Sequence, residues 1–155
     1  MTSILATPIT RPEITTAVVD YPRYKSSIHA IRTEVFVREQ RIPLEREVDN
    51  LDWASQHVLA FCDGHPIGTG RLTPAGRIGR VAVSRPWRRQ GVGLCIMRQL
   101  LTLAAQSEHR EVILSAQSHA IEFYEKLGFR REGTEFLEVG IIHMTMRKRL
   151  ATGPI

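Results

Sequence analysis

The residues best suited to chemistry surround a basic turn that contains two glycines. A valine-rich run, residues 78–83, leads into Arg88, Arg89, Gly91 and Gly93, and a helical apolar pattern starts there. Free N–H groups at a helix start, the positive end of the helix dipole and close backbone approach at glycine together favour an anion. The glycine spacing matches neither the dinucleotide fingerprint nor the Walker-type loop. The turn therefore predicts an anion site of another kind.

The distribution of charge agrees with an anionic ligand. The chain has a net charge of +5, with 18 arginines and only 3 lysines. Residues 64–107 contain seven arginines and no acid, whereas the remaining residues carry 14 basic and 16 acidic side chains, a balance of −2. Arginine forks bind phosphate well, although most charge runs are only solvated surface. A nucleic-acid binder is not expected, because exposed aromatics do not alternate with the arginines and no helix-turn-helix pattern is present.

Length and composition limit the architecture. A chain of 155 residues with 43% hydrophobic and 24% charged residues predicts one globular domain. We expect an irregular arm over residues 1–12, a single domain over 13–150 and a tail over 151–155. No apolar run reaches the length of a membrane span, and no secretory signal opens the chain. Cys62 and Cys95 stand far apart without a CxxC motif or a histidine at ligand spacing, which predicts reduced thiols in a cytoplasmic protein. No membrane partner is expected.

Apolar periodicity predicts an alternation of strands and helices that positions this turn. Strands are expected over residues 14–19, 56–62, 67–73, 78–83, 111–116, 129–136 and 140–147, and helices over 24–40, 92–104 and 118–126. Asp63-Gly64 is a hairpin signal, so three antiparallel strands should follow one another. The acidic stretch over residues 45–52 is either a loop or a short helix. This order predicts an α/β (α+β) domain with a mixed sheet.

Two motifs resemble the GNAT superfamily of N-acetyltransferases. Arg88, Gly91 and Gly93 fill the pattern [RQ]-x-x-G-x-[GA], and residues 123–129 read F-Y-E-K-L-G-F, as does the family's helix end. Further similarity to the ElaA-like branch lies in residues 32–40, 49–57, 78–81 and 140–144. The resemblance implies a mainly antiparallel central sheet of six to seven strands flanked by helices. It also implies that the fourth and fifth strands splay apart.

The resemblance further implies acetyl-CoA (coenzyme A) as the bound cofactor. Its pyrophosphate would meet the turn amides, its pantetheine arm would follow the fourth strand, and Gln117 would take the place usually held by asparagine. The implied cofactor-binding residues are Val81, Ala82, Val83, Arg88, Arg89, Gln90, Gly91, Val92, Gly93, Leu94, Gln117 and Tyr124.

Acetyl transfer to an amine needs a proton for the leaving thiolate and a base for the attacking nitrogen. Tyr124 matches the motif tyrosine, which the resemblance casts as the general acid, although a helix tyrosine is also a common core residue. Residues 78–83 contain no carboxylate, so the base must lie elsewhere or be water. His143 is the leading candidate for the base, since imidazole exchanges protons near neutral pH, but a lone histidine on a strand is more often structural. The other candidates are His57, His119 and Glu39, and no metal site is expected.

The acceptor side is less determined by the sequence. Glu39 and His57 are candidate substrate residues, and the acids over residues 45–52 either attract a cationic amine or form a solvated loop. Ile142 and Val139 depart from the pattern of the branch near this side, so no acceptor is transferred by resemblance.

The resulting hypothesis is an acetyl-CoA-dependent N-acetyltransferase that moves an acetyl group to a primary amine. The amine would attack directly in a ternary complex, in a monomer or a homodimer. The alternative is a non-catalytic acyl-CoA-binding regulatory module, which would keep the turn but need neither Tyr124 nor an open acceptor pocket.

Overall fold

The structure is a computed structural model that describes residues 13–151, so the predicted arm over residues 1–12 and residues 152–155 of the predicted tail lie outside the described residues. The strands are β1 (Ile14–Val19), β2 (Gln56–Cys62), β3 (His65–Leu72), β4 (Ile78–Val83), β5 (Glu111–Gln117), β6 (Arg130–Glu138) and β7 (Ile141–Arg149). The helices are α1 (Tyr21–Arg32), α2 (Leu44–Glu47), α3 (Val92–Gln106) and α4 (Ile121–Lys126). Four short helical segments complete them: η1 (Thr33–Glu39), η2 (Asp52–Ala54), η3 (Arg85–Trp87) and η4 (Ser118–Ala120).

The first four strands form an antiparallel sheet in the order β1-β2-β3-β4. The predicted hairpin is confirmed: Cys62 pairs with His65, and Asp63 and Gly64 both have positive φ, at 48° and 79°. Two positive φ values in a two-residue loop match the twist of the flanking strands. The three antiparallel strands predicted from these turns are therefore present.

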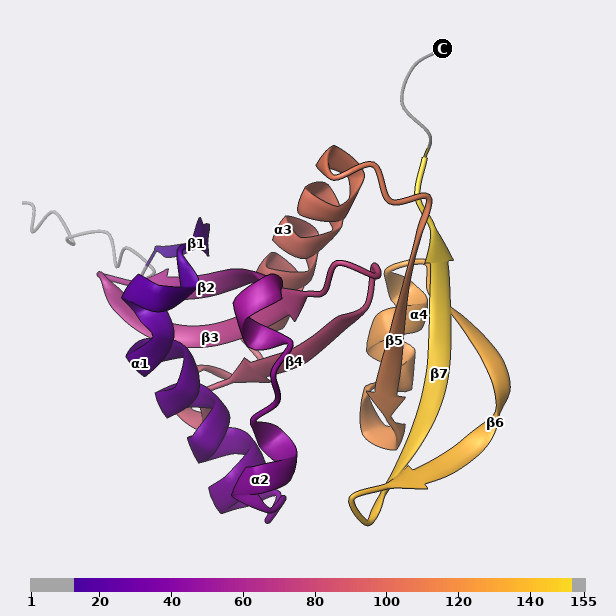
Figure 1. Ribbon diagram of the computed structural model, residues 1–155, viewed down its shortest axis with the longest axis horizontal. Coiled ribbons are helices and arrows are strands. Elements are labelled where there is room, and N and C mark those ends of the chain that lie inside the picture. The colour runs from indigo at the N-terminus through magenta and orange to yellow at the C-terminus, as the bar shows by residue number, and fades with distance from the viewer. Residues whose placement is uncertain (1–12, 152–155) are drawn as a thin grey trace, which may run out of the picture.

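The remaining strands form a second antiparallel sheet in the order β5-β7-β6 (Figure 1). Within residues 13–151, β4 and β5 are joined by one isolated parallel bridge, Arg77 with Ile113, and then diverge. The splay between the fourth and fifth strands is confirmed, and it divides the expected central sheet into sheets of four and three strands.

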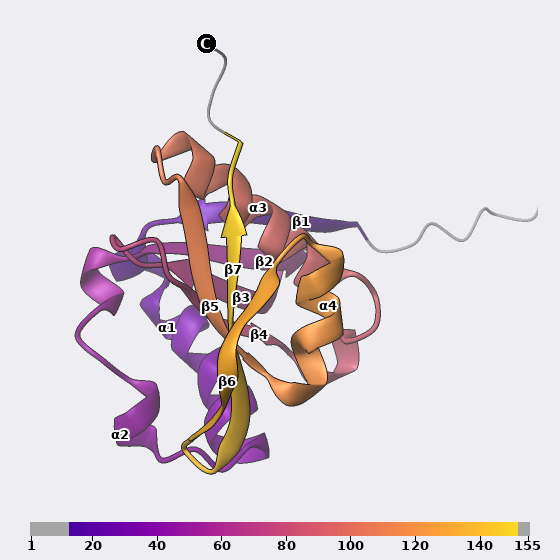
Figure 2. The ribbon, with the colours of Figure 1, turned by 90° about the vertical axis from the view of Figure 1, so that its right-hand side faces the viewer.

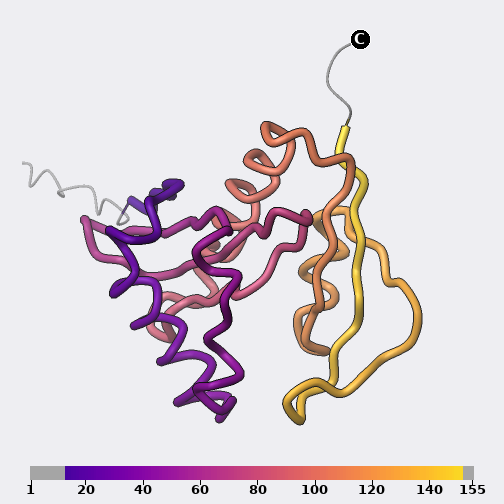
Figure 3. Tube along the Cα trace, in the orientation of Figure 1, coloured from indigo at the N-terminus to yellow at the C-terminus, as the bar shows by residue number. Residues whose placement is uncertain are grey.

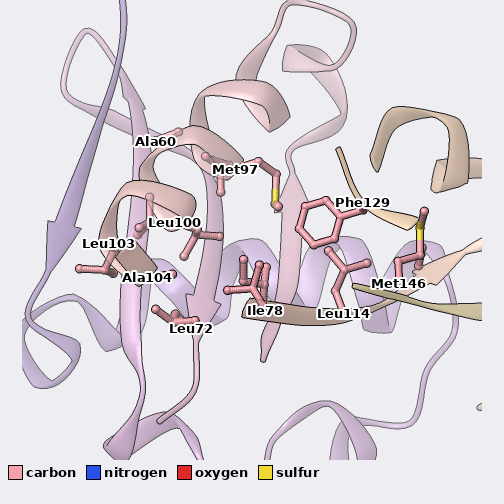
Figure 4. Close-up of a cluster of buried hydrophobic side chains, with 14 of the residues drawn as sticks. Ala60, Leu72, Ile78, Met97, Leu100, Leu103, Ala104, Leu114, Phe129 and Met146 are labelled. Atoms are coloured by element: carbon pink, nitrogen blue, oxygen red, sulfur yellow. The ribbon is translucent and has the colours of Figure 1, made fainter. Parts of the chain in front are cut away.

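A shared core holds the two sheets together. Met97 and Leu100 on α3 pack with Leu114 on β5, Phe129 before β6 and Met146 on β7 (Figure 4). Glycine on β3 lets α3 lie close to the sheet, because a Cβ at position 68 would stand 2.8 Å from the Ile96 side chain. The same core therefore fixes the position of β5 relative to β4.

The opposite face of the first sheet is covered by α1 and its continuation, η1. The helix predicted over residues 24–40 begins earlier, at Tyr21, because Pro22 fits the first helical turn, where an N–H is not required. Its last part is a π-helix, which the apolar pattern did not predict. Figure 2 shows α4 on one side of the second sheet and α1 and α2 on the other. In the trace of Figure 3, α2 and the β6–β7 turn lie at the same end of the molecule.

Candidate active site

A cavity of about 690 Å³ opens where β4 and β5 diverge. Its wall includes four residues singled out in the sequence: Val81, Gln117, Tyr124 and His143. The other lining side chains come from η1, the segment around α2, strands β3 to β5, and the β6–β7 hairpin. The strand split therefore brings Val81 and His143, which are 62 positions apart in the chain, to one cavity.

Tyr124 is both a core residue and a cavity residue. Its ring meets Phe123 and Phe129 edge to face, with centroids 5.1 and 5.9 Å away. Burial raises the pKa of Tyr124 to about 12, so the phenol keeps its proton at neutral pH. The two alternatives predicted for this residue, packing and a role at the site, are thus compatible.

His143 lines the cavity from β7 and has a defined tautomer. Its Nδ1 lies 2.7 Å from the Ile141 carbonyl oxygen, which can only accept, so Nδ1 carries the hydrogen. The imidazole also stacks on Phe136 at 5.7 Å, and the residue is 8% exposed. In the neutral ring this arrangement leaves the Nε2 lone pair free to accept a proton.

Gln117 is held across the strand split by a second glutamine. The Gln117 side-chain nitrogen donates to the Gln40 side-chain oxygen at 2.8 Å, and Gln40 donates back at 3.2 Å. Gln40 follows directly on η1, so this pair links the end of the π-helix to the end of β5.

The glycine turn has the geometry that the anion prediction requires. Gly91 has φ 82° at the N-cap of α3, and Arg89 has φ 63°, a left-handed conformation that costs a non-glycine residue energy. Helix α3 begins at Val92, so its first N–H groups have no acceptor within the helix. No atom lies within 4 Å of a Cβ built at Gly91. The turn residues thus fit a bound pyrophosphate.

The other predicted cofactor residues lie in β4 and along the turn. Ala82 is buried on the α1 side of β4, whereas Val83 packs toward the α3 side. Arg89 and Gln90 are exposed, Val92 is buried, and Gly93 and Leu94 form the first turn of α3.

Arg88 already has two partners in the protein. Its Nε donates to the Val83 carbonyl oxygen at 2.9 Å, and its guanidinium forms an ion pair with Glu39 at 2.8 Å. Glu39 therefore stands at the cofactor turn and does not line the cavity, where its predicted substrate role would place it.

We expect Glu39→Gln to strengthen coenzyme A binding. The carboxylate competes with phosphate for Arg88, and a partly exposed ion pair is worth up to about 1 kcal/mol, so the Kd should fall about threefold. Calorimetric titration with coenzyme A measures this change. Glu34→Gln, on the same π-helix and in no ion pair within residues 13–151, is the matched control. Weaker binding by Glu39→Gln would contradict the competition.

His57 does not reach the cavity, which corrects its prediction as a substrate residue. It is 1% exposed, its Nε2 lies 2.8 Å from the Asp52 carbonyl oxygen, and its ring stacks on Tyr21 at 4.6 Å. Burial lowers the pKa of His57, which favours the neutral ring. The stacking on Tyr21 places this side chain against α1, and it is not part of the cavity wall.

Three of the four acids over residues 45–52, all except the exposed Glu45, are bound by arginines and are not free to attract a cation. Glu47 and Asp52 are 2% and 1% exposed and both bind Arg32, which is 0% exposed. Asp49 binds Arg71 through two hydrogen bonds, at 2.7 and 2.8 Å. These ion pairs attach the acidic segment to α1 and β3, and they form one wall of the cavity.

Arg80 joins this network from a bulge in β4. The register of β3 with β4 shifts opposite Gly70, and Arg80 adopts φ 52° there. Its guanidinium binds the Glu47 carbonyl oxygen and Asp49, both at 3.1 Å. A bulge leaves backbone groups outside the ladder, so the same irregularity that positions Arg80 frees backbone beside Val81.

We expect Asp49→Asn to weaken the fold most at neutral pH. The Arg71 hydrogen bond lowers the Asp49 pKa from 3.8 to about 2. A carboxylate whose pKa is lowered by folding stabilises the folded state at any pH above its ordinary pKa. This stabilisation, here about 2 kcal/mol, is lost as the pH falls through the lowered pKa. Urea unfolding should therefore show a difference between the two proteins that shrinks from about pH 5 toward pH 2. A difference independent of pH would contradict this assignment.

The sequence did not single out Arg32, Arg71, Arg77 or Arg80 as residues of this region. The available signal was the acid-free segment that contains three of them, read against the acidic segment over residues 45–52. The sequence shows a basic segment and an acidic segment, but only the fold shows which arginine binds which carboxylate.

Two further searches concern metals and membranes. Within the described residues, no three His, Cys, Asp or Glu side chains are grouped so that they could hold a metal ion. Over residues 13–151, no helix is both long and apolar enough to cross a membrane.

Comparison with known proteins identifies the family. Residues 24–150 match the model of the acetyltransferase (GNAT) domain. The uncharacterized N-acetyltransferase YjcF of Bacillus subtilis (strain 168) is 39% identical over 122 residues, covering 76% of this chain and 87% of that protein. Protein ElaA of Escherichia coli (strain K12) is 30% identical over 128 residues, covering 77% and 84%.

Solved structures agree. The crystal structure of an acyl-CoA N-acyltransferase from Pseudomonas aeruginosa has a TM-score of 0.75 at 33% identity and covers 89% of this chain and 99% of that one. The crystal structure of Escherichia coli ElaA has a TM-score of 0.77 at 25% identity, with 88% and 99% covered. The chain therefore belongs to the GNAT acetyltransferase family, with ElaA among its relatives, and is an acyltransferase of the kind that uses an acyl-CoA donor.

Proposed function

We propose that this protein transfers an acetyl group from acetyl-CoA to a primary amine by direct attack in a ternary complex. The observation that carries the proposal is the convergence of Val81, Tyr124 and His143 on one cavity at the strand split. Bound acetyl-CoA supplies the acetyl group as a thioester. A carbon–nitrogen bond forms, the carbon–sulfur bond breaks, and the proton lost by nitrogen is balanced by the proton gained by sulfur.

Different residues of the chain have different proposed roles in this reaction. Tyr124 holds a proton at its hydroxyl oxygen and is the proposed general acid for the thiolate. Because its pKa is about 12, above that of an ordinary thiol, it acts chiefly through a hydrogen bond to the sulfur. Backbone N–H groups at the β4 bulge, with Val81 as the candidate, polarise the carbonyl. The Arg89–Leu94 turn and Arg88 hold the pyrophosphate, and Gln117 meets the pantetheine arm.

We expect His143→Gln to lower kcat about tenfold, because solvent water can take over part of the role of a general base. The exposed His119, the alternative base outside the cavity wall, provides the matched control as His119→Gln. If both variants keep the wild-type kcat, His143 is structural.

Two measurements test the proposed function itself. Calorimetry should show micromolar binding of acetyl-CoA and of desulfo-CoA, and free-thiol release in the presence of a panel of amines should show turnover. Absence of coenzyme A binding would overturn the proposal. Binding without turnover on any amine would favour the regulatory module, for which the acceptor cavity and the placement of Tyr124 have no use.

We also propose that the protein works in the cytoplasm. Cys62 is buried and Cys95 is partly buried, and both are free thiols, which supports a reducing compartment.

A further inference from the structure

The charges that line the cavity favour an anionic group on the acceptor. Four arginines line it (Arg46, Arg71, Arg77 and Arg80) against three carboxylates (Glu47, Asp49 and Glu138). Glu47 and Asp49 are already bound to arginines, so they offer little to a cationic ligand. A substrate with several positive charges would therefore meet guanidinium groups in this wall with only Glu138 left to balance them.

Arg77 is the cavity arginine best placed to bind a ligand. Arg71 and Arg80 are held by Asp49, whereas neither Arg46 nor Arg77 forms an ion pair with any acid of residues 13–151. Of these two, the one whose side chain is oriented by a hydrogen bond is Arg77. It is also not loose: its backbone bridges to Ile113, and its Nη1 donates to the Ser115 hydroxyl at 3.1 Å. A guanidinium has five N–H donors, so most of them stay available for a ligand.

The position of Arg77 defines one end of the cavity. It stands where β4 and β5 are still bridged, and Tyr124 and His143 line the same cavity beyond it, where the strands have diverged. The hydroxyls of Thr73, Ser115 and Thr145 share this lining. The planar guanidinium of Arg77, beside these hydroxyl groups, is suited to a carboxylate, which accepts two parallel hydrogen bonds.

Apolar side chains occupy other parts of the wall. Phe36 and Ile42 come from η1 and the chain after it, Leu51 from the acidic segment, and Leu137 and Val139 from the β6–β7 hairpin. Leu51 and Leu137 are 43% and 73% exposed, so they form an unusually apolar rim for an open site. A ligand that carries an apolar group beside its charged group would cover them.

We propose that the acceptor is a small amine that carries a carboxylate and an apolar side chain, such as a free apolar amino acid, and that Arg77 binds the carboxylate. This inference rests on the proposed function, since it names the acceptor class of the same site. Arg77 is then a specificity-determining residue, and the amine lies toward Tyr124 and His143.

A binding experiment tests the acceptor class without turnover. The protein saturated with desulfo-CoA is titrated by calorimetry with L-phenylalanine and L-leucine, each compared with its amide and with the amine that lacks the carboxyl group. We expect the acids to bind about tenfold more tightly than either form that lacks the carboxylate, as loss of a charge-assisted hydrogen bond would give. Equal or weaker binding of the acids, or no binding by any of them, overturns the inference.

Variants of Arg77 assign the contact. Arg77→Gln keeps a hydrogen-bonding side chain without charge. It should weaken binding of the acids about tenfold and leave binding of the amines that lack a carboxylate within about twofold. Arg77→Lys should retain part of the preference, and Arg98→Gln, an exposed arginine on α3 outside the cavity wall, should change nothing. An equal loss of affinity for the acids and for the amines that lack a carboxylate would contradict a carboxylate contact.

Kinetics separates this inference from the proposed function. If the acids bind preferentially but free-thiol release stays at background, the acceptor class holds and the enzyme assignment fails. If amines that lack a carboxylate are acetylated as well as the acids are, the enzyme assignment holds and the acceptor class fails. In an active enzyme, Arg77→Gln should raise KM for L-phenylalanine and leave kcat and the KM for acetyl-CoA unchanged.

Discussion

Tyr124→Phe should lower kcat by about 100-fold while the affinity for acetyl-CoA changes less than about threefold. The ring, and with it the packing on Phe123 and Phe129, is retained, so the variant removes only the hydroxyl group. If the phenol supplies a hydrogen bond to the leaving thiolate, its loss is felt in the transition state and hardly in the ground state. Steady-state kinetics with free-thiol detection, together with calorimetry, measure the two effects separately.

The matched control for this change is Tyr24→Phe. Tyr24 packs edge to face on Phe61 from α1 and lies outside the cavity wall, so its variant should keep the wild-type kcat. The pH profile adds a second check. With a pKa of about 12, Tyr124 stays protonated well beyond neutral pH, so its ionisation should not slow the wild type below about pH 10. Full activity of Tyr124→Phe would show that Tyr124 has no role as a general acid and serves only to pack the core.

The largest expected loss of stability follows from Arg32→Met. Arg32 is fully buried and binds Glu47 and Asp52, whose second oxygens, Oε2 and Oδ2, have no hydrogen-bond partner in the described part of the chain. Removing the cation leaves two buried carboxylates with too few partners, which costs about 3–5 kcal/mol. Urea unfolding followed by circular dichroism measures the difference.

Two companion variants separate the buried charge from other effects of this substitution. Arg131→Met breaks an exposed ion pair with Glu125 and should leave the unfolding midpoint unchanged. Arg32→Met combined with Glu47→Met removes a buried charge of each sign and should recover part of the lost stability. A double variant as unstable as Arg32→Met would show that shape, and not unpaired charge, causes the loss.

Local pattern predicted the elements that the site needs. The strands over residues 14–19, 56–62 and 78–83 have the expected bounds, because alternation and turn residues are encoded within a few positions. The resemblance placed Val81, Gln117 and Tyr124 at the site, and His143 was one of several candidate bases; all four line the cavity. Their chemical roles stay predictions until the variants are measured.

What the sequence could not supply are contacts between distant segments. Arg32 reaches Asp52 across 20 positions and Arg71 reaches Asp49 across 22, and nothing in either neighbourhood selects the partner. The π-helix is a second example: a helical pattern does not reveal the wider turns that carry Glu39 to Arg88. His57 does not line the cavity although its register partner Arg71 does, because Tyr21 of α1 stacks on it; an alternation pattern shows the face of a strand but not which helix covers it.

The division of the strands into two sheets changes the number of edges. A continuous seven-stranded sheet would leave its backbone unsatisfied along two outer strands, whereas here β4 and β5 are edges as well. Exposed edges invite pairing with another chain, but these two face each other inside one molecule and meet at one bridge within residues 13–151. A ligand with amide groups of its own can join such an edge as a strand would. In the proposed function, the pantetheine arm, which carries amide groups, would pair with the backbone that the fold leaves unpaired between these two edges.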